Sequence, residues 1–357
     1  MTAHDAFIHQ WNRVMRLITL LSGLLVAACA QEGPHGMDRL AGVDAKLAFT
    51  CVHEKIPAAS ADTDVLFQYA RWLQKDNQLK QDTTVDTEIE RLYRIAAENR
   101  HYKANVNLQN GTMRGQFKLS GEELLRLSQQ LIDAKVATGY YFIATYLQRG
   151  SAGLQQDPEM ALRYYRKAAD EGNAQAQTHV AEKLFPINIA PDIARQMRRC
   201  AAEQGNGDAA ASMGVDMKNS RRYGDALEAF QLGVASGDAI SASFLGKGFR
   251  GPLPDDRLHY LGQKEDPERA ERYKQISKLL SRWSYANPTV PEINDIVPLP
   301  PAKLPAWDGK LKWVEERKAN VQPTKPTEAL IEQLAKAKLL DPKTGKPLPE
   351  SLLHKKN

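Results

Sequence analysis

The sequence predicts an all-α protein in which a solenoid of helical hairpins is followed by an extended proline-rich strap and a terminal helix. Three observations lead to this prediction. A helical segment recurs four times, each copy reaches a turn at the same position, and the composition changes abruptly after Trp283. With 357 residues, 42% of them apolar, the chain is long enough to bury a sizeable core.

Charge and cysteine content exclude several classes of protein. The net charge is +5, from 48 Lys and Arg against 43 Asp and Glu, which is too small and too evenly spread to indicate a nucleic-acid partner. Three cysteines are too few for a disulfide-rich scaffold or a four-thiolate zinc site. These numbers alone do not point to a function.

The first 28 residues are predicted to be a secretory signal peptide. A short, mostly apolar run, Leu17–Val26, follows Arg13 and Arg16 and precedes two alanines and Cys29. The run is too short to span a bilayer, which takes about 20 apolar residues. Translation could start at Met1 or at Met15, and the sequence leaves both starts open.

The end of this signal resembles the lipobox of bacterial lipoproteins, because it reads Val26-Ala27-Ala28-Cys29. The resemblance implies that the thiol of Cys29 is acylated and that Cys29 becomes the mature N-terminus. Ala30 at the next position implies anchoring in the outer membrane, with the body of the protein in the periplasm. The alternative is an ordinary signal peptide with an incidental cysteine. Residues 29–60 are expected to form a linker that leads into the repeats.

Two further cysteines, Cys51 and Cys200, remain in the mature chain. Because the periplasm is oxidising, we expect them to form a disulfide. The alternative is two buried free thiols, since the sequence does not reveal the distance between them.

The middle of the chain contains the repeated segment. Its four copies are residues 88–104, 160–176, 192–209 and 225–242, with turn residues Arg100, Gly172, Gly205 and Gly237. Two small or apolar residues precede each turn, so that neighbouring helices can approach closely. Glycine adopts the left-handed conformation at a helix C-terminus with little steric cost. Since one such hairpin cannot bury its apolar face alone, neighbouring hairpins must stack.

The unit from Ala152 to Gly172 resembles the SEL-one-like repeat, a tetratricopeptide-type helical hairpin. The matching residues are Leu154, Asp157, Ala161, Tyr164, Tyr165 and Gly172. The resemblance implies a right-handed solenoid, which we expect over residues 61–285. Two features depart from the pattern: Arg100 replaces the turn glycine, and Asn105–Leu119 is interpreted as an insertion.

Residues 286–357 are predicted to form a proline-rich strap and a C-terminal helix. Apolar residues, including Trp307 and Trp313, are interleaved with the prolines, which is not typical of a solvated linker. We expect the strap to lie on an apolar surface, preferably that of the solenoid, with both tryptophans buried; a partner protein is the alternative. The helix is expected over Thr327–Leu340, and the residues from Pro342 on are expected to be loose.

The stretch Glu292–Trp313 resembles a C-terminal domain of unknown function found in SEL-one-like repeat lipoproteins of proteobacteria. Cys51–Pro57 and Leu66–Asn77 are similar to the same proteins. Several of them act as periplasmic immunity proteins against type VI secretion phospholipase effectors. The resemblance therefore implies a secreted phospholipase as the protein partner. The alternative function is an outer-membrane-anchored scaffold or activator of envelope machinery.

No motif in the sequence indicates catalysis. There is no nucleophile elbow, no zinc-protease motif and no phosphate-binding loop. His53 and Glu54 lack a second ligand at metal-binding spacing, and His179 is interpreted as a packing residue. We therefore expect a protein that is not an enzyme and that needs neither a cofactor nor a metal.

Partner-binding residues are expected on the first helix of each hairpin, which lines the concave face of tetratricopeptide-type arrays. Aligning these helices on a small residue gives a mixed stripe of aromatic, polar and charged side chains, which suits a protein interface. The candidates are Arg71, Tyr141, Gln148, Glu182, Lys218, Lys247 and Arg250. The alternative is a solvated groove, covered by the strap.

Overall fold

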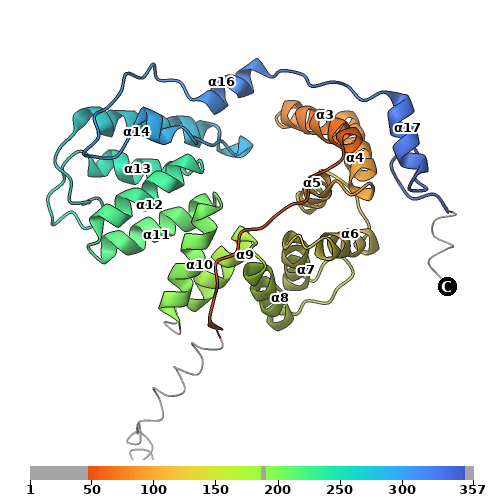
Figure 1. Cartoon of the computed structure of the whole chain (residues 1–357), viewed down its shortest axis with the longest axis horizontal. Helices are drawn as coiled ribbons and strands as arrows, with labels where there is room; N and C mark the ends of the chain where they lie inside the picture. The colour runs from red at the N-terminus through yellow and green to blue at the C-terminus, as the bar shows by residue number, and fades with distance from the viewer. Residues whose placement is uncertain (1–46, 186–189, 350–357) are drawn as a thin grey trace, which may run out of the picture. The chain divides into compact units, whose positions relative to one another are not determined.

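The computed structural model of the protein describes residues 47–185 and 190–349 (Figure 1). The predicted signal peptide and Cys29 lie outside the described residues. The chain divides after Ala48, and the fold described below belongs to the unit that begins at Phe49. Within the described ranges the regular structure is helical, and no helix there is both long enough and apolar enough to cross a membrane.

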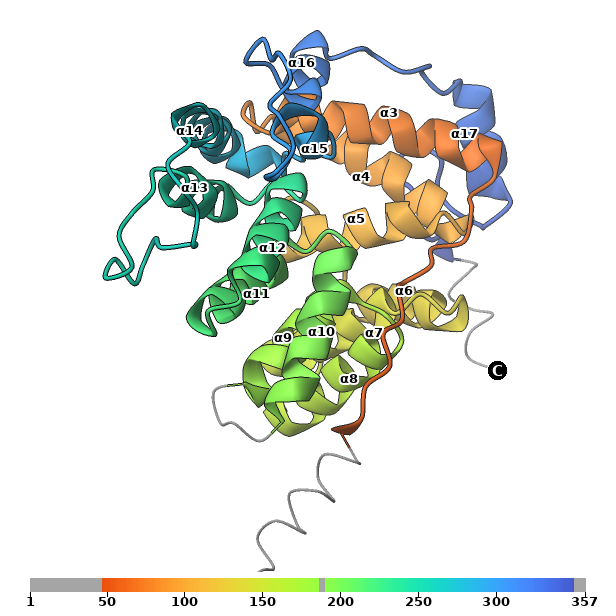
Figure 2. The ribbon, with the colours of Figure 1, turned by 60° about the vertical axis from the view of Figure 1, so that its left-hand side comes forward.

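Six helical hairpins follow one another along the described chain, each packed on the next (Figures 1 and 2). Their helices are α3 (Ala61–Asn77), α4 (Thr83–Glu98), α5 (Tyr102–Met113), α6 (Gly121–Asp133), α7 (Thr138–Arg149), α8 (Pro158–Asp170), α9 (Ala174–Leu184), α10 (Pro191–Glu203), α11 (Gly207–Asn219), α12 (Tyr223–Ala235), α13 (Ala239–Gly248) and α14 (Pro267–Arg282). The predicted all-α solenoid of hairpins is confirmed.

The four predicted turn residues share one backbone conformation. Their φ angles are 65° at Arg100, 105° at Gly172, 84° at Gly205 and 88° at Gly237. Each turn closes with two backbone hydrogen bonds of the Schellman type, for example from Gly172 N to Ala169 O (3.1 Å) and from the following N–H to Ala168 O (2.9 Å). The residue after each turn caps the next helix with its side chain, namely His101, Asn173, Asn206 and Asp238. Arg100 is therefore a turn residue although it is not glycine.

The interpretation of Asn105–Leu119 as an insertion is wrong. These residues form most of α5 and its turn, and α5 pairs with α6 as a complete hairpin. The error has a physical cause, because α5 buries polar side chains where the apolar pattern requires hydrophobic ones. Asn105 donates to Leu127 O (3.0 Å), and Gln109 accepts from the hydroxyl of Ser128 (2.9 Å).

Residues 49–60 run extended across the repeats before α3 begins. Glu54 N donates to Gly172 O (3.2 Å), and the carboxylate of Glu54 accepts from the N–H (2.5 Å) and the hydroxyl (2.9 Å) of Thr138. The backbone passes so close to Gly172 that a Cβ there would lie 2.7 Å from Glu54 N. The lead-in segment is therefore part of the packed structure.

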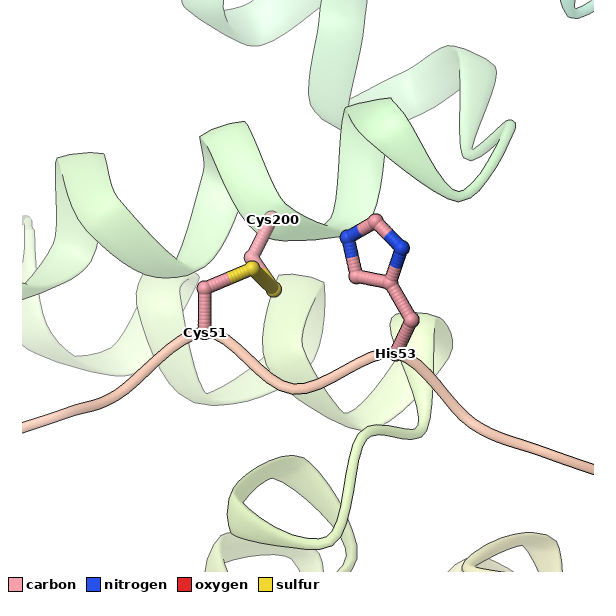
Figure 3. Close-up of side chains that lie close together, drawn as sticks. All are labelled: Cys51, His53 and Cys200. Carbon is pink, nitrogen blue, oxygen red and sulfur yellow. A yellow bond between two sulfur atoms is a disulfide. The ribbon is translucent and has the colours of Figure 1, made fainter.

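Cys51 in this segment is joined by a disulfide to Cys200 on α10, with 5.5 Å between their Cα atoms (Figure 3). Val52 O, next along the segment, accepts a hydrogen bond from Gln177 Nε2 (3.0 Å). The ring of His53 lies beside the disulfide, and potential ligand atoms of the three side chains fall within 4.8 Å of one another. Because the disulfide uses both sulfurs, this form offers no thiolate to a metal ion.

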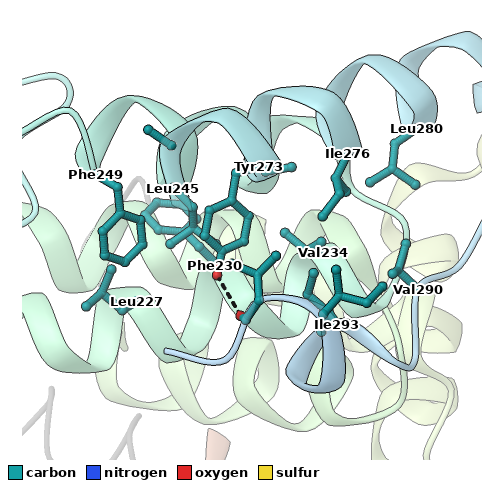
Figure 4. Close-up of a cluster of buried hydrophobic side chains, with 14 of the residues drawn as sticks. Leu227, Phe230, Val234, Leu245, Phe249, Tyr273, Ile276, Leu280, Val290 and Ile293 are labelled. Atoms are coloured by element: carbon teal, nitrogen blue, oxygen red, sulfur yellow. Dashed lines mark hydrogen bonds between the residues drawn. The ribbon is translucent and has the colours of Figure 1, made fainter. Parts of the chain in front are cut away.

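The strap packs against the last two hairpins (Figure 4). It contains a 3-10 turn (Ser284–Ala286) at its start and then α15 (Ile293–Ile296) and α16 (Lys312–Ala319). Its buried aliphatic side chains are Val290, Ile293, Ile296, Val297, Leu311 and Val314. Polar contacts fix the register, since Gln231 Nε2 (2.8 Å) and the hydroxyl of Tyr273 (3.2 Å) both donate to Val297 O. The prediction that the strap docks on the solenoid is confirmed.

The two tryptophans of the strap are half-buried, so the prediction that they are buried is wrong. The aliphatic side chains of the strap fill the space between the helices and leave the indoles at its margin. Trp307 donates to Lys310 O (2.8 Å), while the Arg272 guanidinium lies 6.0 Å from its ring centre. Trp313 meets Trp283 edge to face, at 5.9 Å between ring centres.

The C-terminal helix α17 (Glu328–Lys336) packs on α3 and α4 and is shorter than the predicted range Thr327–Leu340. Arg91 of α4 holds it, donating to Glu328 (2.6 Å) and to Pro342 O (2.6 Å). The residues after Pro342 are not loose as far as the structure describes them, because Leu348 N donates to Leu339 O (2.8 Å). The loop around Gly345 also lies against α4, which the helical periodicity of the sequence did not indicate.

The C-terminal segment thus contacts both the last hairpin and the first one. Between these contacts, α16 and the residues after it reach α3 (Figure 1). Trp72 Nε1 donates to Asn320 O (3.2 Å), and Arg317 donates to Lys75 O (2.8 Å). These contacts enclose the candidate site.

Candidate partner-binding site

The seven residues predicted to bind a partner have different surroundings. Gln148, Glu182, Lys247 and Arg250 are exposed, Arg71 and Tyr141 are half-buried, and Lys218 is buried. Arg71 lines a cavity between α3 and the C-terminal segment, whereas Lys247 lines a separate pocket on α13. The structure therefore does not gather the seven side chains into one site.

Lys218 is not available to a partner, so its prediction as a contact is wrong. Only 7% of the residue is exposed, and its ammonium group donates to Arg257 O (2.7 Å) and to Asn219 Oδ1 (2.9 Å). The cation supports the loop between α13 and α14. Helical periodicity alone could not reveal this loop contact.

Tyr141 has a largely structural environment. Its ring packs at 5.7 Å from that of Tyr165 and at 6.2 Å from that of Phe142. Burial raises the pKa of its hydroxyl, and the nearby Tyr165 adds to the effect. Because the side chain is only half-buried, the exposed part of Tyr141 is all that a partner protein can contact.

A cavity of about 810 Å³, called here the cationic cavity, lies between α3, the end of α5 and the C-terminal segment. Four cationic side chains line it: Arg71 and Lys75 from α3, Arg114 from the end of α5, and Arg317 from α16. Among the described residues, none of the four has a carboxylate within ion-pair distance. The one acid in the lining, Asp86, is engaged by the amides of Asn77 (2.9 Å) and Gln116 (2.7 Å).

Neutral side chains bonded to one another underlie the cations. The carbonyl of Gln74 accepts from Arg71 (3.1 Å) and from the Tyr93 hydroxyl (3.0 Å), while its amide donates to Gln116 (2.9 Å). Burial raises the pKa of Tyr93 to about 12, so its hydroxyl stays protonated. Hydrogen bonds thus hold Arg71 in position before any ligand arrives.

Two of the four cations, Lys75 and Arg114, have lowered pKa values. Burial lowers the pKa of Lys75, and the positive charges of Arg71 and Arg317 lower it further. Burial and the charge of Arg71 likewise lower the pKa of Arg114. Glu316 acts in the opposite direction on Lys75 but forms no ion pair with it. An anion in this cavity would relieve the repulsion.

An aromatic pocket of about 350 Å³ adjoins the cationic cavity and shares Arg71, Lys75 and Arg317 with it. Its wall includes the indoles of Trp72 and Trp313, which are both half-buried. Arginine beside partly exposed tryptophan is the composition found at the energetic centres of protein interfaces.

Sequence reasoning found Arg71 but missed the other three cations. Arg317 reaches α3 only because the strap folds back along the repeats, and no spacing in the sequence signals that path. Lys75 and Arg114 are adjacent to Arg71 in the fold, on α3 and at the end of α5. Since α5 was interpreted as an insertion, Arg114 had no predicted place on a surface.

The C-terminal part of the chain matches a known protein family. Residues 241–348 match the family described as a domain of unknown function, DUF6396. The match begins within α13, so it covers the end of the repeats together with the strap, α16 and α17. None of the curated proteins compared with the chain matches it significantly.

Three solved structures from Pseudomonas aeruginosa are similar to this fold. The protein named 5086 (PA5086) has 26% identity and a TM-score of 0.52, with 71% of this chain and 95% of that protein covered. The immunity protein PA5088 has 24% identity and a TM-score of 0.55, with 71% and 94% covered. The immunity protein Pa5087 has 23% identity and a TM-score of 0.54, with 71% and 95% covered.

These likenesses extend over nearly the whole length of the three proteins and include their arrangement of helices. Combined with the turn repeated at Arg100, Gly172, Gly205 and Gly237, they agree with the family resemblance in the sequence. The chain is therefore similar to SEL-one-like repeat proteins in its stacked hairpins, and its residues 241–348 match the DUF6396 domain.

Proposed function

We propose that the chain is an immunity protein, which binds a type VI secretion phospholipase effector in the periplasm and neutralises it by protein–protein contact. One observation carries the proposal: the fold is shared with Pseudomonas proteins that include two immunity proteins, over 94–95% of their length. The partner's phospholipase activity comes from the resemblance of Glu292–Trp313 and its neighbouring motifs to lipoproteins of that kind.

The periplasmic location rests on the N-terminal sequence. Val26-Ala27-Ala28-Cys29 has the order of a lipobox, and a disulfide between Cys51 and Cys200 suits an oxidising compartment. A lipid on Cys29 would hold the protein at the outer membrane, where a phospholipase meets its substrate. Mass spectrometry of the mature N-terminus tests this part, because an unmodified N-terminus beyond residue 29 would contradict lipidation.

Neutralisation by binding needs no catalytic group on this chain. A repeat solenoid presents an extended surface on several rigid helices, so it can cover either the active site of a lipase or the surface by which the lipase reaches lipid. The half-buried arginines and tryptophans around α3 and α16 are suitable anchors for such a contact.

The experiment first asks whether a phospholipase effector is encoded beside this gene, and then mixes that effector with the mature chain without its lipid anchor. We expect a stable complex by calorimetry and loss of lipase activity on phospholipid vesicles as the complex forms. No binding at micromolar concentrations would end the immunity proposal. Binding without inhibition would favour the envelope-scaffold alternative, as would envelope defects after gene deletion in a strain that lacks the effector.

A further inference from the structure

The cationic cavity differs from the other arginine sites of this protein. Two poorly exposed arginines elsewhere have carboxylate partners, since Arg94 pairs with Glu90 and Glu123 and Arg126 pairs with Glu98. The buried Arg198 forms no ion pair among the described residues, but it is a single cation stacked over the ring of Phe185. Arg71, Lys75, Arg114 and Arg317 converge on one cavity with no such partner among the described residues. Since unpaired cations close together are unfavourable, their arrangement suits a ligand that brings negative charge.

The geometry also describes the kind of anion. Arginine side chains with open guanidinium edges bind planar carboxylates through two parallel hydrogen bonds. The cavity of about 810 Å³ is far larger than a single small ion requires. Beside it, Trp72 and Trp313 present aromatic surface that a free phosphate would leave unused. Together these features suit a peptide segment that combines acidic and apolar side chains.

We propose that the cationic cavity and the aromatic pocket together bind an acidic segment of the partner protein. Carboxylates of the segment pair with Arg71 and Arg114, and an apolar side chain lies against Trp72 and Trp313. This inference rests on the proposed function, because it names the surface that an inhibited effector contacts. Arg317 and Lys75 make the site depend on the docking of α16 against α3.

The test compares two double variants with the same change in net charge. The first, Arg71→Glu with Arg114→Glu, reverses charge inside the cavity. The control, Arg199→Glu with Lys278→Glu, reverses charge at exposed positions on α10 and α14 that form no ion pair among the described residues. A neutral double variant, Arg71→Gln with Arg114→Gln, separates loss of contact from repulsion. Circular dichroism and melting curves establish that all three are folded.

With the phospholipase effector of the proposed function as the probe, we expect the cavity variant to bind about 100-fold more weakly than the wild type. The neutral variant should lose part of the affinity, and the control should bind like the wild type. If the wild type binds and the cavity variant binds equally well, or if both charge variants weaken equally, the inference is wrong while the immunity proposal stands. If the wild type does not bind, the immunity proposal fails instead.

In that second case a labelled hexaglutamate peptide tests the cavity directly by fluorescence anisotropy. Binding to the wild type and the control, but not to the cavity variant, supports an acidic-peptide site. Inorganic phosphate and phosphatidylglycerol vesicles serve as competing probes at matched ionic strength. If either of them binds through Arg71 and Arg114 while the peptide does not, the acidic-segment proposal is overturned.

Discussion

The carbonyl oxygen of Pro288 occupies the place where a side chain on Gly237 would begin. A Cβ built on Gly237 would lie 1.8 Å from that oxygen, and the φ angle of Gly237 is 88°. Just beyond, Val290 N donates to Ala235 O (2.9 Å), so the strap pairs with the end of α12. The turn glycine therefore serves two purposes, because it allows both the left-handed turn and the passage of the strap.

Comparing Gly237→Ala with Gly205→Ala separates the contribution of the left-handed turn from that of the strap contact. Gly205 has nearly the same φ angle, 84°, but its nearest neighbouring atom would lie 4.0 Å from an added Cβ. We expect Gly205→Ala to cost about 1 kcal/mol, from conformation alone. Gly237→Ala should cost about 2 to 4 kcal/mol, since the strap must also move. Urea unfolding measures both, and equal losses would show that the strap does not press on this turn.

The repeated turns were predictable from the sequence because their requirements are local. Each helix end needs a residue in the left-handed conformation followed by a capping side chain. Both requirements can be recognised in the few residues around the turn, even where Arg100 takes the place of glycine. The hairpin of α5 and α6 was not predictable in the same way. Its buried Asn105 and Gln109 are hydrogen-bonded to each other and to Leu127 O and the Ser128 hydroxyl on α6, and a periodicity that counts only apolar residues does not register them.

The candidate site was predictable only in part for a related reason. Arg71 could be identified from its place on a repeat helix. Arg317 reaches the site through a chain path that crosses from the last hairpin to the first, and such long-range docking leaves no periodic signal. Lys218 shows the opposite case, because a position that is exposed in the repeat pattern is covered by a loop contact at Arg257 O.

The strap provides a second prediction, about which of its residues hold it. Ile293 is buried among α12–α14, whereas Trp307 is half-buried. We expect Ile293→Ala to cost about 2 to 4 kcal/mol and to free the strap, and Trp307→Ala to cost about 1 kcal/mol. Melting curves and limited proteolysis after Asn287 measure the effect. A larger loss of unfolding free energy for Trp307→Ala than for Ile293→Ala would show that the tryptophans are the main contacts that hold the strap.

The third prediction concerns the disulfide of the lead-in segment. Reduction should release residues 49–56 from α10 and lower the midpoint of urea unfolding by the equivalent of about 2 to 5 kcal/mol. The double variant Cys51→Ser with Cys200→Ser should match the reduced wild type and should not respond to dithiothreitol. Peptide mapping without reduction reports the bond itself. Two free thiols in protein isolated from the periplasm would contradict the pairing.

The fourth prediction is a dependence of stability on pH that originates at His101. This buried residue caps α5 by accepting the N–H of Ala104 at its Nδ1 atom (3.1 Å), so the cap requires the neutral ring. Burial lowers its pKa in the folded state, although the hydrogen bond with Asp64 acts in the other direction. Because the folded pKa is depressed, the contribution is present above the unfolded value of about 6.5 and is lost as the pH falls below it.

Asparagine at this position tests that mechanism, since Asn173 and Asn206 cap the corresponding helices of other hairpins. We expect the free energy of unfolding of the wild type to fall between about pH 7 and pH 5. In His101→Asn the fall should be smaller, with the remainder due to groups such as His179, whose pKa burial also lowers. An unchanged pH dependence in the variant would rule out His101 as its source.

The last prediction tests whether the cationic cavity is strained before it binds anything. Arg114 lies at the end of α5 with no ion pair among the described residues, and the charge of Arg71 opposes its own. Replacing Arg114 with glutamine should therefore leave the stability of the free protein unchanged or raise it, although the same change weakens binding of the partner. The Debye length is about 10 Å at 0.1 M salt and shortens to about 3 Å at 1 M, so any gain should disappear as the salt concentration rises. Arg199→Gln, an exposed change on α10, is the matched control and should have no effect at either ionic strength. Melting temperatures at low and high salt provide the measurement. A clear loss of stability in Arg114→Gln at low salt would mean that this arginine stabilises the fold. The inference that the cations of the cavity are placed to bind an anionic ligand would then be contradicted.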